Sequence, residues 1–253
     1  MEKDKYLLNS LSKALLVINI LSKHESLSLA EISKLSNFDK ASTFRILYTL
    51  EANNFVEKSE DARYKLGLAF LKYGSIVTAK LDLVSVSKPL IQKASLMSHV
   101  PIHLGVISGN RVITIHIENS SNDLEVTGRV GMSAQLYVTA MGRVLLSSLS
   151  DTFYQKLCED FSFKQYSSNS IKNKTELDQI IIQTREHGYA TDINDRYPGF
   201  GSVAVPIRNY SNQVVAAISV VTLSQNIEQY FSEYLDILEN LAASISENLG
   251  YKA

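Results

Sequence analysis

The stretch that decides the fold is SLSLAEISKLSNFDKASTFRILYTLEANNFVEKSEDARYKL, residues 26–66. Within it Ser28 is placed to cap a helix, and Glu31 three positions later completes a capping box. Residues 36–38 form a short polar turn, after which Asp39 is placed to cap a further helix. The spacing predicts two helices joined by a three-residue turn.

The flanking residues extend this pattern in both directions. Residues 10–22 have apolar side chains at helical spacing, and Ser10 is available as their N-cap. After the last helix, residues 55–56 and 64–66 are short strand formers around a turn-prone Ser-Glu-Asp-Ala. Helix, helix, turn, helix and two-stranded ribbon is the order of a winged helix-turn-helix. We expect these side chains to face inward: Leu11, Leu15, Ile18, Leu21, Leu29, Ile32 and Leu35.

The helix after Asp39 has two chemically different sides. At about 100° per residue, Phe44, Leu47 and Leu50 share one side and are expected in the core. Arginine bonds guanine edges bidentately, and hydroxyls bond base edges or phosphates. A solvated polar face on an ordinary helix is the alternative, but the ordered motifs around it favour DNA reading. The expected DNA-contacting residues are Lys40, Ser42, Thr43, Arg45, Thr49, Lys58, Arg63 and Lys65.

Charge is distributed unevenly along the 253 residues, although the whole chain has a net charge of only −1. Residues 1–80 carry 12 Lys+Arg against 9 Asp+Glu, whereas residues 81–253 carry 13 against 17. A mildly basic head on an acidic body is the sign pattern of a DNA-contacting protein. An apolar content of 45% is ordinary for a globular chain and excludes a disordered one.

The single cysteine, Cys158, excludes a disulfide framework and a cysteine-based zinc cluster within one chain. A core or surface thiol is a more probable role for it than a nucleophile. No apolar run approaches the roughly 18 residues that cross a bilayer, and the first residues lack an apolar signal segment. We therefore expect a cytoplasmic protein with no membrane contact and no cofactor.

The rest of the chain is expected to form a second, larger domain. Residues 67–100 read as mostly helical, with Pro89 as an interruption, and from Pro101 the apolar period changes from 3.6 to 2. Gly109-Asn110 marks a hairpin, and a third strand is expected over 124–130. The predicted fold class is α+β, with an antiparallel sheet flanked by helices. The expected domains are a winged helix-turn-helix over 1–67, a linker helix over 68–82 and an effector-binding domain over 83–253.

Two histidines of this hairpin allow two interpretations. With Gly109-Asn110 as the turn, His103 and His116 are expected directly opposite each other on one face of the sheet. Facing imidazoles can hold a metal or titrate near neutrality. Partly exposed neighbours are the more probable reading, and without a third ligand nearby we predict no metal site.

Several ordered motifs carry a family resemblance. The segment from LSKALLVINILS to DARYKLG resembles the amino-terminal domain of the IclR family of bacterial transcription regulators. LYVTAMGRVLLSSL, REHGYATD and GSVAVPIRNYSNQVVAAISVV resemble the effector-binding domain of that family. The resemblance covers roughly residues 10–225, and it implies a GAF/PAS-like domain with a small-molecule pocket, usually for a small carboxylate or aromatic acid.

Matching the motifs implies which residues bind the effector. These residues are Ala140, Met141, Asp192, Ser202 and Ser219. The helix that begins at Ala140 presents backbone N–H groups and a positive dipole end, a seat for a carboxylate. The family often has a cysteine at Ser202 and a serine at Val221, so the chain departs from it at both positions. Losing a hydroxyl at Val221 favours a less polar effector than the smallest oxoacids.

The predicted function is a ligand-responsive DNA-binding regulator that acts as a repressor. Its partners are a palindromic operator, a small-molecule effector and further copies of the chain, as a dimer or a dimer of dimers. An enzyme is a rival, but the chain has no GxSxG elbow, HExxH motif or phosphate-binding glycine loop. A sensor that does not bind DNA is the second rival, and a salt-sensitive gel shift separates it from a regulator.

Overall fold

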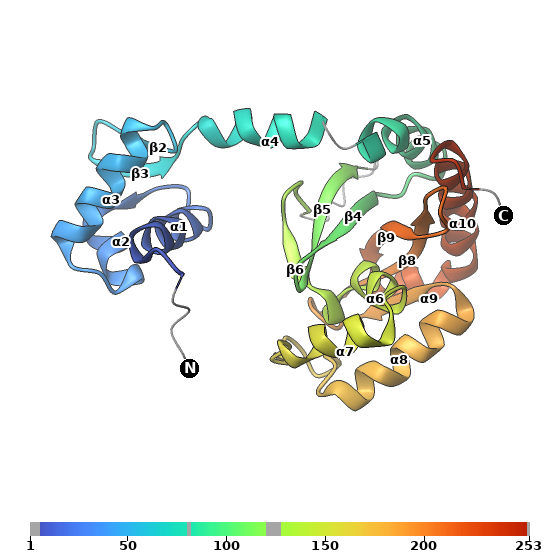
Figure 1. Ribbon diagram of the computed structural model, residues 1–253. Coiled ribbons are helices and arrows are strands. Elements are labelled where there is room, and N and C mark those ends of the chain that lie inside the picture. Colours follow the sequence, from blue (N-terminus) through green and yellow to red (C-terminus); the bar gives the residue numbers. More distant parts are fainter. Residues whose placement is uncertain (1–5, 80–81, 120–127, 252–253) are drawn as a thin grey trace. The chain divides into compact units, whose positions relative to one another are not determined.

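The computed structural model describes residues 6–79, 82–119 and 128–251, which fall into two units, Met1–Lys80 and Leu81–Ala253. We call the first unit the head and the second the sensor unit. The elements of the head are α1 (Asn9–Leu21), β1 (Leu27–Ser28), α2 (Leu29–Ser36), α3 (Lys40–Ala52), β2 (Val56–Lys58), β3 (Arg63–Leu66) and α4 (Ala69–Ala79). This is the winged helix-turn-helix order, with a three-stranded wing in the order β1-β3-β2 (Figure 1).

The caps of α2 and α3 confirm the helix starts predicted from the sequence. Ser28 accepts a hydrogen bond from the backbone of Glu31, whose carboxylate accepts one from the Ser28 N–H at 2.7 Å. Asp39 accepts from the Ser42 N–H at 2.8 Å. The prediction for Ser10 is wrong, because α1 begins at Asn9, after Leu8, with no side-chain cap.

The core of the head is turned relative to the predicted apolar faces. In α3 the buried stripe is Thr43, Leu47 and Leu50, spaced i, i+4 and i+7, so Phe44 is half exposed rather than inward. In α1 the buried side chains are those of Val17 and Leu21. The other inward predictions that the structure overturns are Leu11, Leu15 and Leu35, each more than half exposed.

One glycine joins the wing to α4. At Gly67 an added Cβ would lie 2.3 Å from the Asn54 carbonyl oxygen, so only glycine permits this approach. The Phe55 ring meets Phe70 of α4 edge to face at a centroid distance of 5.2 Å, and it stacks on Tyr73 of α4 at 5.6 Å. The first turns of α4 therefore pack against the winged helix-turn-helix through Phe55.

The sensor unit is built on one six-stranded antiparallel sheet with the order β6-β5-β4-β9-β8-β7. Helices α5 and α10 cover one face, and α6 covers the other with α8 behind it (Figure 1). No helix in the described part of the chain is long and apolar enough to cross a membrane. The elements are α5 (Asp82–Ser98), β4 (Ile102–Ser108), β5 (Arg111–Glu118), β6 (Ser133–Gln135), η1 (Leu136–Val138), α6 (Ala140–Ser147), α7 (Asp151–Glu159), α8 (Lys174–His187), β7 (Ala190–Ile193), β8 (Phe200–Arg208), β9 (Val214–Leu223), α9 (Ser224–Gln229) and α10 (Phe231–Asn248).

A bulge in β5 overturns the predicted pairing of the two histidines. Gly105 pairs with Thr114, but Leu104 pairs with His116 and His103 with Ile117, so Ile115 is the extra residue. Directly paired residues share a face of the sheet. One extra residue therefore places His116 on the face of Leu104, toward α5 and α10, and His103 on the opposite face.

Two other expectations change in detail. Most of the strand predicted over 124–130 lies outside the described residues, and 128–130 are not strand. Pro89 lies inside α5 and does not end the helix.

The capping box makes a testable contribution to the stability of the head. We expect Ser28→Ala to destabilise the head by about 1 kcal/mol, because the first turn of α2 loses its N-cap. Denaturant unfolding of the full chain, followed by a probe in the head, measures this. Ser12→Ala, an exposed position within α1, is the matched control and leaves stability unchanged within about 0.5 kcal/mol. Equal stabilities of the two variants would contradict the role of the cap.

Candidate nucleic-acid interface and candidate effector cavity

The exposed side of α3 is centred on Arg45, which lies opposite the stripe of Thr43, Leu47 and Leu50. Lys40 is exposed at the start of the same helix. The side chains of Arg45 and Lys40 make no hydrogen bond or ion pair with any described residue. Both cations are therefore available to a ligand outside the head.

The hydroxyl residues predicted beside Arg45 differ in their accessibility. Ser42 donates from its hydroxyl to Asp39 at 2.7 Å, and Thr49 donates to the Arg45 carbonyl at 2.8 Å, and both remain accessible. Thr43 is wrong as a DNA contact. Its side chain is fully buried, and its hydroxyl donates to the Asp39 carbonyl at 2.9 Å, which is how a polar residue is tolerated in the core.

The basic residues of the wing each contact another residue of the head. Lys65 forms an ion pair with Glu57 at 3.0 Å, and the Lys58 ammonium lies 5.7 Å from the centre of the Tyr64 ring. Arg63 donates to the hydroxyl and the carbonyl oxygen of Ser26, each at 3.0 Å, so it braces β3 against the start of β1. Lys58 and Lys65 remain exposed, whereas Arg63 is half-buried.

Two aromatic side chains on the exposed side of α3 were missed. Phe44 and Tyr48 are 50% and 64% exposed, and their ring centres are 6.2 Å apart. Their i, i+4 spacing was the available signal, because two aromatic residues one turn apart form a stripe of their own. Phe44 is predicted inward with Leu47 and Leu50, but Thr43 takes that place in the core.

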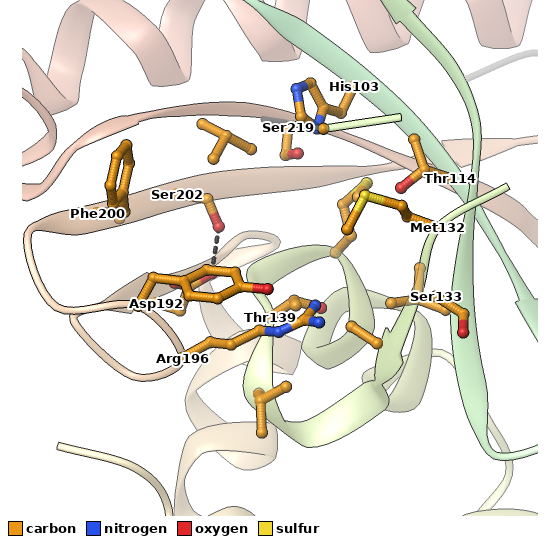
Figure 2. Close-up of a pocket in the computed structure, with 18 of the residues that line it drawn as sticks. His103, Thr114, Met132, Ser133, Thr139, Asp192, Arg196, Phe200, Ser202 and Ser219 are labelled. Carbon is orange, nitrogen blue, oxygen red and sulfur yellow. Dashed lines mark hydrogen bonds between the residues drawn. The ribbon is translucent and has the colours of Figure 1, made fainter. Parts of the chain in front are cut away.

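A cavity of about 450 Å³ opens on the α6 face of the sheet in the sensor unit (Figure 2). Strands β4, β5, β8 and β9 form one wall, and the start of α6 and the segment after β7 form the other. Of the predicted effector residues, Met141, Asp192, Ser202 and Ser219 line it, whereas Ala140 is buried behind it. The residues that sequence reasoning did not place here include His103, Thr114, Met132, Arg196, Tyr197 and Phe200.

Asp192 joins three elements at the centre of this cavity. Its carboxylate accepts hydrogen bonds from the Ala140 N–H at 2.9 Å and from the Ser202 hydroxyl, the bond drawn in Figure 2. Burial raises the pKa of Asp192, although the nearby Arg143 guanidinium and these hydrogen bonds oppose the rise. Asp192 thus occupies part of the helix end that we expected to seat a ligand carboxylate, and the Gly142 N–H donates to Thr139.

A buried ion pair fixes α6 against the end of β7. Arg143 and Asp195 are 3% and 7% exposed and bond directly. The same guanidinium donates to the carbonyls of Tyr137, at 3.1 Å, and Thr191. A fully hydrogen-bonded charge pair of this kind gives unique geometry rather than large stability. It holds the segment bearing Asp192 in place beside α6.

Two polar atoms of the cavity wall have no partner among the described residues. They are Nε2 of His103 and Oγ of Ser219, whose residues are 6% and 1% exposed. Their strands pair so that His103 and Ser219 are direct neighbours. Arg196, the one cationic side chain among the described lining residues, lies at the other end of the cavity in Figure 2.

Metal binding and thiol chemistry receive no support from the described residues. No group of three or more His, Cys, Asp or Glu side chains in 6–79, 82–119 and 128–251 could hold a metal ion. Cys158 is buried in the core beneath α6, where burial raises the pKa of its thiol. A thiol in that environment is a poor nucleophile.

Comparison with protein families agrees with the two units. Residues 10–60 match the IclR helix-turn-helix domain, and residues 76–247 match the bacterial transcriptional regulator IclR C-terminal domain. The chain belongs to the IclR family. It is a DNA-binding transcriptional regulator with a ligand-binding C-terminal domain, and not an enzyme.

Relatives and solved structures extend over nearly the whole regulator. XynR of Escherichia coli is 26% identical over 252 residues, 98% of this chain and 99% of the relative. The repressor AllR of the same organism is 25% identical over 247 residues, with 96% and 91% covered. A regulator from Alicyclobacillus acidocaldarius superposes with a TM-score of 0.81 at 25% identity, covering 96% and 99%. A homologue from Microbacterium hydrocarbonoxydans, solved with 4-hydroxybenzoate, shares the fold at 17% identity with a TM-score of 0.80, covering 95% and 99%.

The buried imidazole gives the sensor unit a pH-dependent stability. Burial lowers the pKa of His103 from 6.5 to about 4, so between these values the unfolded chain binds a proton that the folded chain does not. Stability is fully present above pH 6.5 and decreases as the pH falls toward 4. Over this pH range the wild type is expected to lose on the order of 3 kcal/mol of folding free energy through His103, and His103→Phe is expected to remove that loss. Melting temperatures of both proteins from pH 7 to 4 measure it, and parallel curves would contradict the burial of a neutral imidazole.

Proposed function

We propose that this protein is a cytoplasmic repressor whose affinity for operator DNA is controlled by a carboxylic acid effector. Residues 1–67 bind the operator, 68–82 form the linker and 83–253 bind the effector. The observation that supports the proposed DNA-binding role is the exposed face of α3, which presents Arg45 on the side away from the buried stripe and Lys40 at the start of the helix. Repression as the sign of regulation is supported by the name of the relative AllR.

The proposed DNA-binding form contains two heads on a palindromic operator, in a dimer or a dimer of dimers. Support comes from apolar side chains that one chain leaves exposed, on α1 (Leu11, Leu15 and Leu16) and on α4 (Leu71, Tyr73 and Ile76). Contiguous exposed apolar surface on a regulator favours burial against a second copy. Two-fold pairing presents two α3 helices to two half-sites, which is what an inverted repeat requires.

The chemistry of the cavity supports an acid as the effector. Its walls are mostly apolar, which suits an aliphatic or aromatic body. Arg196 supplies the positive charge for a carboxylate, and Asp192 supplies an acceptor for a donor group on the same ligand. The homologue crystallised with 4-hydroxybenzoate makes aromatic acids the first probes for this chain.

Operator binding tests the proposed DNA contacts. We expect Arg45→Ala to cost about 2 kcal/mol of operator affinity and to relax the preference for the operator over unrelated DNA, because a base contact is lost. Lys40→Ala, the matched control, weakens binding to all sequences and lowers the salt dependence by about one unit. Gel shifts with DNA from the region upstream of the protein's gene measure the affinity of each variant and its salt dependence. If Arg45→Ala keeps the wild-type preference for the operator over unrelated DNA, α3 is not the helix that reads the bases. If the wild type does not bind DNA, or binds it without salt dependence, the alternative of a sensor that does not bind DNA is favoured.

Effector binding tests the cavity independently of the operator. We expect Asp192→Ala and Ser202→Ala to weaken effector binding at least about tenfold, since each loses a hydrogen bond at the centre of the cavity, while operator binding persists. Calorimetry with a panel of aromatic and aliphatic acids, including 4-hydroxybenzoate, gives the affinities. Asp151→Ala, on the exposed start of α7, is the control. Wild-type affinities in both cavity variants would place the effector elsewhere.

A further inference from the structure

The two unpartnered polar atoms of the cavity distinguish its inner end from the rest of the wall. His103 lies on β4 and Ser219 on β9, at directly paired positions, and both side chains point to the α6 face. Buried polar groups in proteins nearly always have a hydrogen-bond partner, so two neighbours without one among the described residues require an explanation.

We propose that His103 and Ser219 form a subsite that hydrogen-bonds an uncharged oxygen of the effector, at the opposite end of the cavity from Arg196. The effector is then a hydroxy- or oxo-carboxylic acid whose carboxylate lies near Arg196 and whose second oxygen reaches this inner end. This inference rests on the proposed function, since it takes the cavity as the effector site.

The chemistry of the inner end selects an uncharged group. A buried imidazole with a pKa of about 4 is neutral at physiological pH, so this end of the cavity carries no positive charge. A carboxylate buried there would lack a cationic partner, which is costly. A neutral imidazole nitrogen and a serine hydroxyl instead complement a hydroxyl, which donates and accepts, or a carbonyl, which accepts from both.

The surrounding backbone holds the imidazole in position. A Cβ added at Gly128 would lie 2.7 Å from Cε1 of His103 and 3.0 Å from Cδ1 of Ile117, so the chain closes directly over the ring. The bulge at Ile115 places Ile117 on this face. The ring is therefore confined, and its Nε2 is presented at a fixed place in the cavity wall, as a specificity site requires.

The first measurement needs no ligand. A residue kept for binding destabilises the free protein when its polar atom is buried without a partner, so replacing it by an isosteric apolar residue does not lower stability. We expect melting temperatures of His103→Phe and Ser219→Ala at pH 7.5 to equal or exceed that of the wild type. A fall of several degrees in both variants would show that the side chains hold the fold together, and would overturn the proposal.

The second measurement uses two matched series of acids, each with a deoxy, a hydroxyl and a carbonyl member. The aromatic series is 4-methylbenzoate, 4-(hydroxymethyl)benzoate and 4-formylbenzoate, and the aliphatic series is pentanoate, 4-hydroxypentanoate and 4-oxopentanoate. In calorimetry on the full-length wild type we expect an oxygen-bearing member of at least one series to bind about tenfold or more tightly than its deoxy partner. In His103→Phe and Ser219→Ala we expect that ratio to fall below about threefold.

The controls carry the same substitutions outside the cavity. His116→Phe replaces the histidine on the other face of the same hairpin, and Ser87→Ala replaces a buried serine of α5 whose hydroxyl is also unpartnered among the described residues. Both are expected to keep the wild-type ratio. Together they separate loss of this subsite from a general effect of removing a histidine or a buried hydroxyl.

The outcomes separate this inference from the proposed function. Equal binding of deoxy and oxygen-bearing acids, lost in Asp192→Ala, overturns the subsite and leaves the effector cavity in place. A preference that survives in His103→Phe and Ser219→Ala also overturns the subsite. Failure of every acid to bind overturns the ligand class, while the operator assay still decides the DNA-binding role. A hydroxyl preference and a carbonyl preference both support the subsite and identify which oxygen it takes.

Discussion

The sensor unit depends on how the hydrogen bonds of one partly buried carboxylate, that of Asp192, are satisfied. Asp192 lies at the edge strand of the sheet, yet its oxygens accept from the first N–H of α6 and from the hydroxyl of Ser202 on the neighbouring strand. A carboxylate placed there without these donors would be strongly destabilising. The positions of β7, β8 and α6 are therefore linked through a single side chain, and the cavity is the space those elements leave between them.

The alternation of side chains along the strands divides the sheet into two chemically different faces. The face toward α5 and α10 is almost wholly aliphatic and forms a core with residues such as Ile102, Leu104 and Ile218. The opposite face carries Ser202, Ser219 and His103. Burying the apolar face stabilises the unit, which frees the other face to carry polar groups that stability alone would not select.

Most of the fold was predictable because its signals are local. Capping residues, turn residues and a change in apolar period identify the winged helix-turn-helix and the antiparallel sheet from short windows of sequence. The errors arose where tertiary context overrides such windows. Thr43 is in the core because its hydroxyl finds a backbone acceptor, and Phe44 is displaced outward as a result. The extra residue at Ile115 has no signature in a run of alternating β-branched residues, so the positions of His103 and His116 could not be derived.

The same limit applies to the cavity. The motifs implied Asp192, Ser202 and Ser219, but Arg196 and His103 come from segments far apart in sequence that only the folded sheet brings to one space. Such a site leaves polar groups under-satisfied in the ligand-free protein, which lowers its stability. A ligand that supplies the missing partners binds the ordered cavity in preference to any loosened state and shifts the population toward it. Under the proposed function, these unpartnered polar groups are the means by which a bound acid alters the state of the regulator.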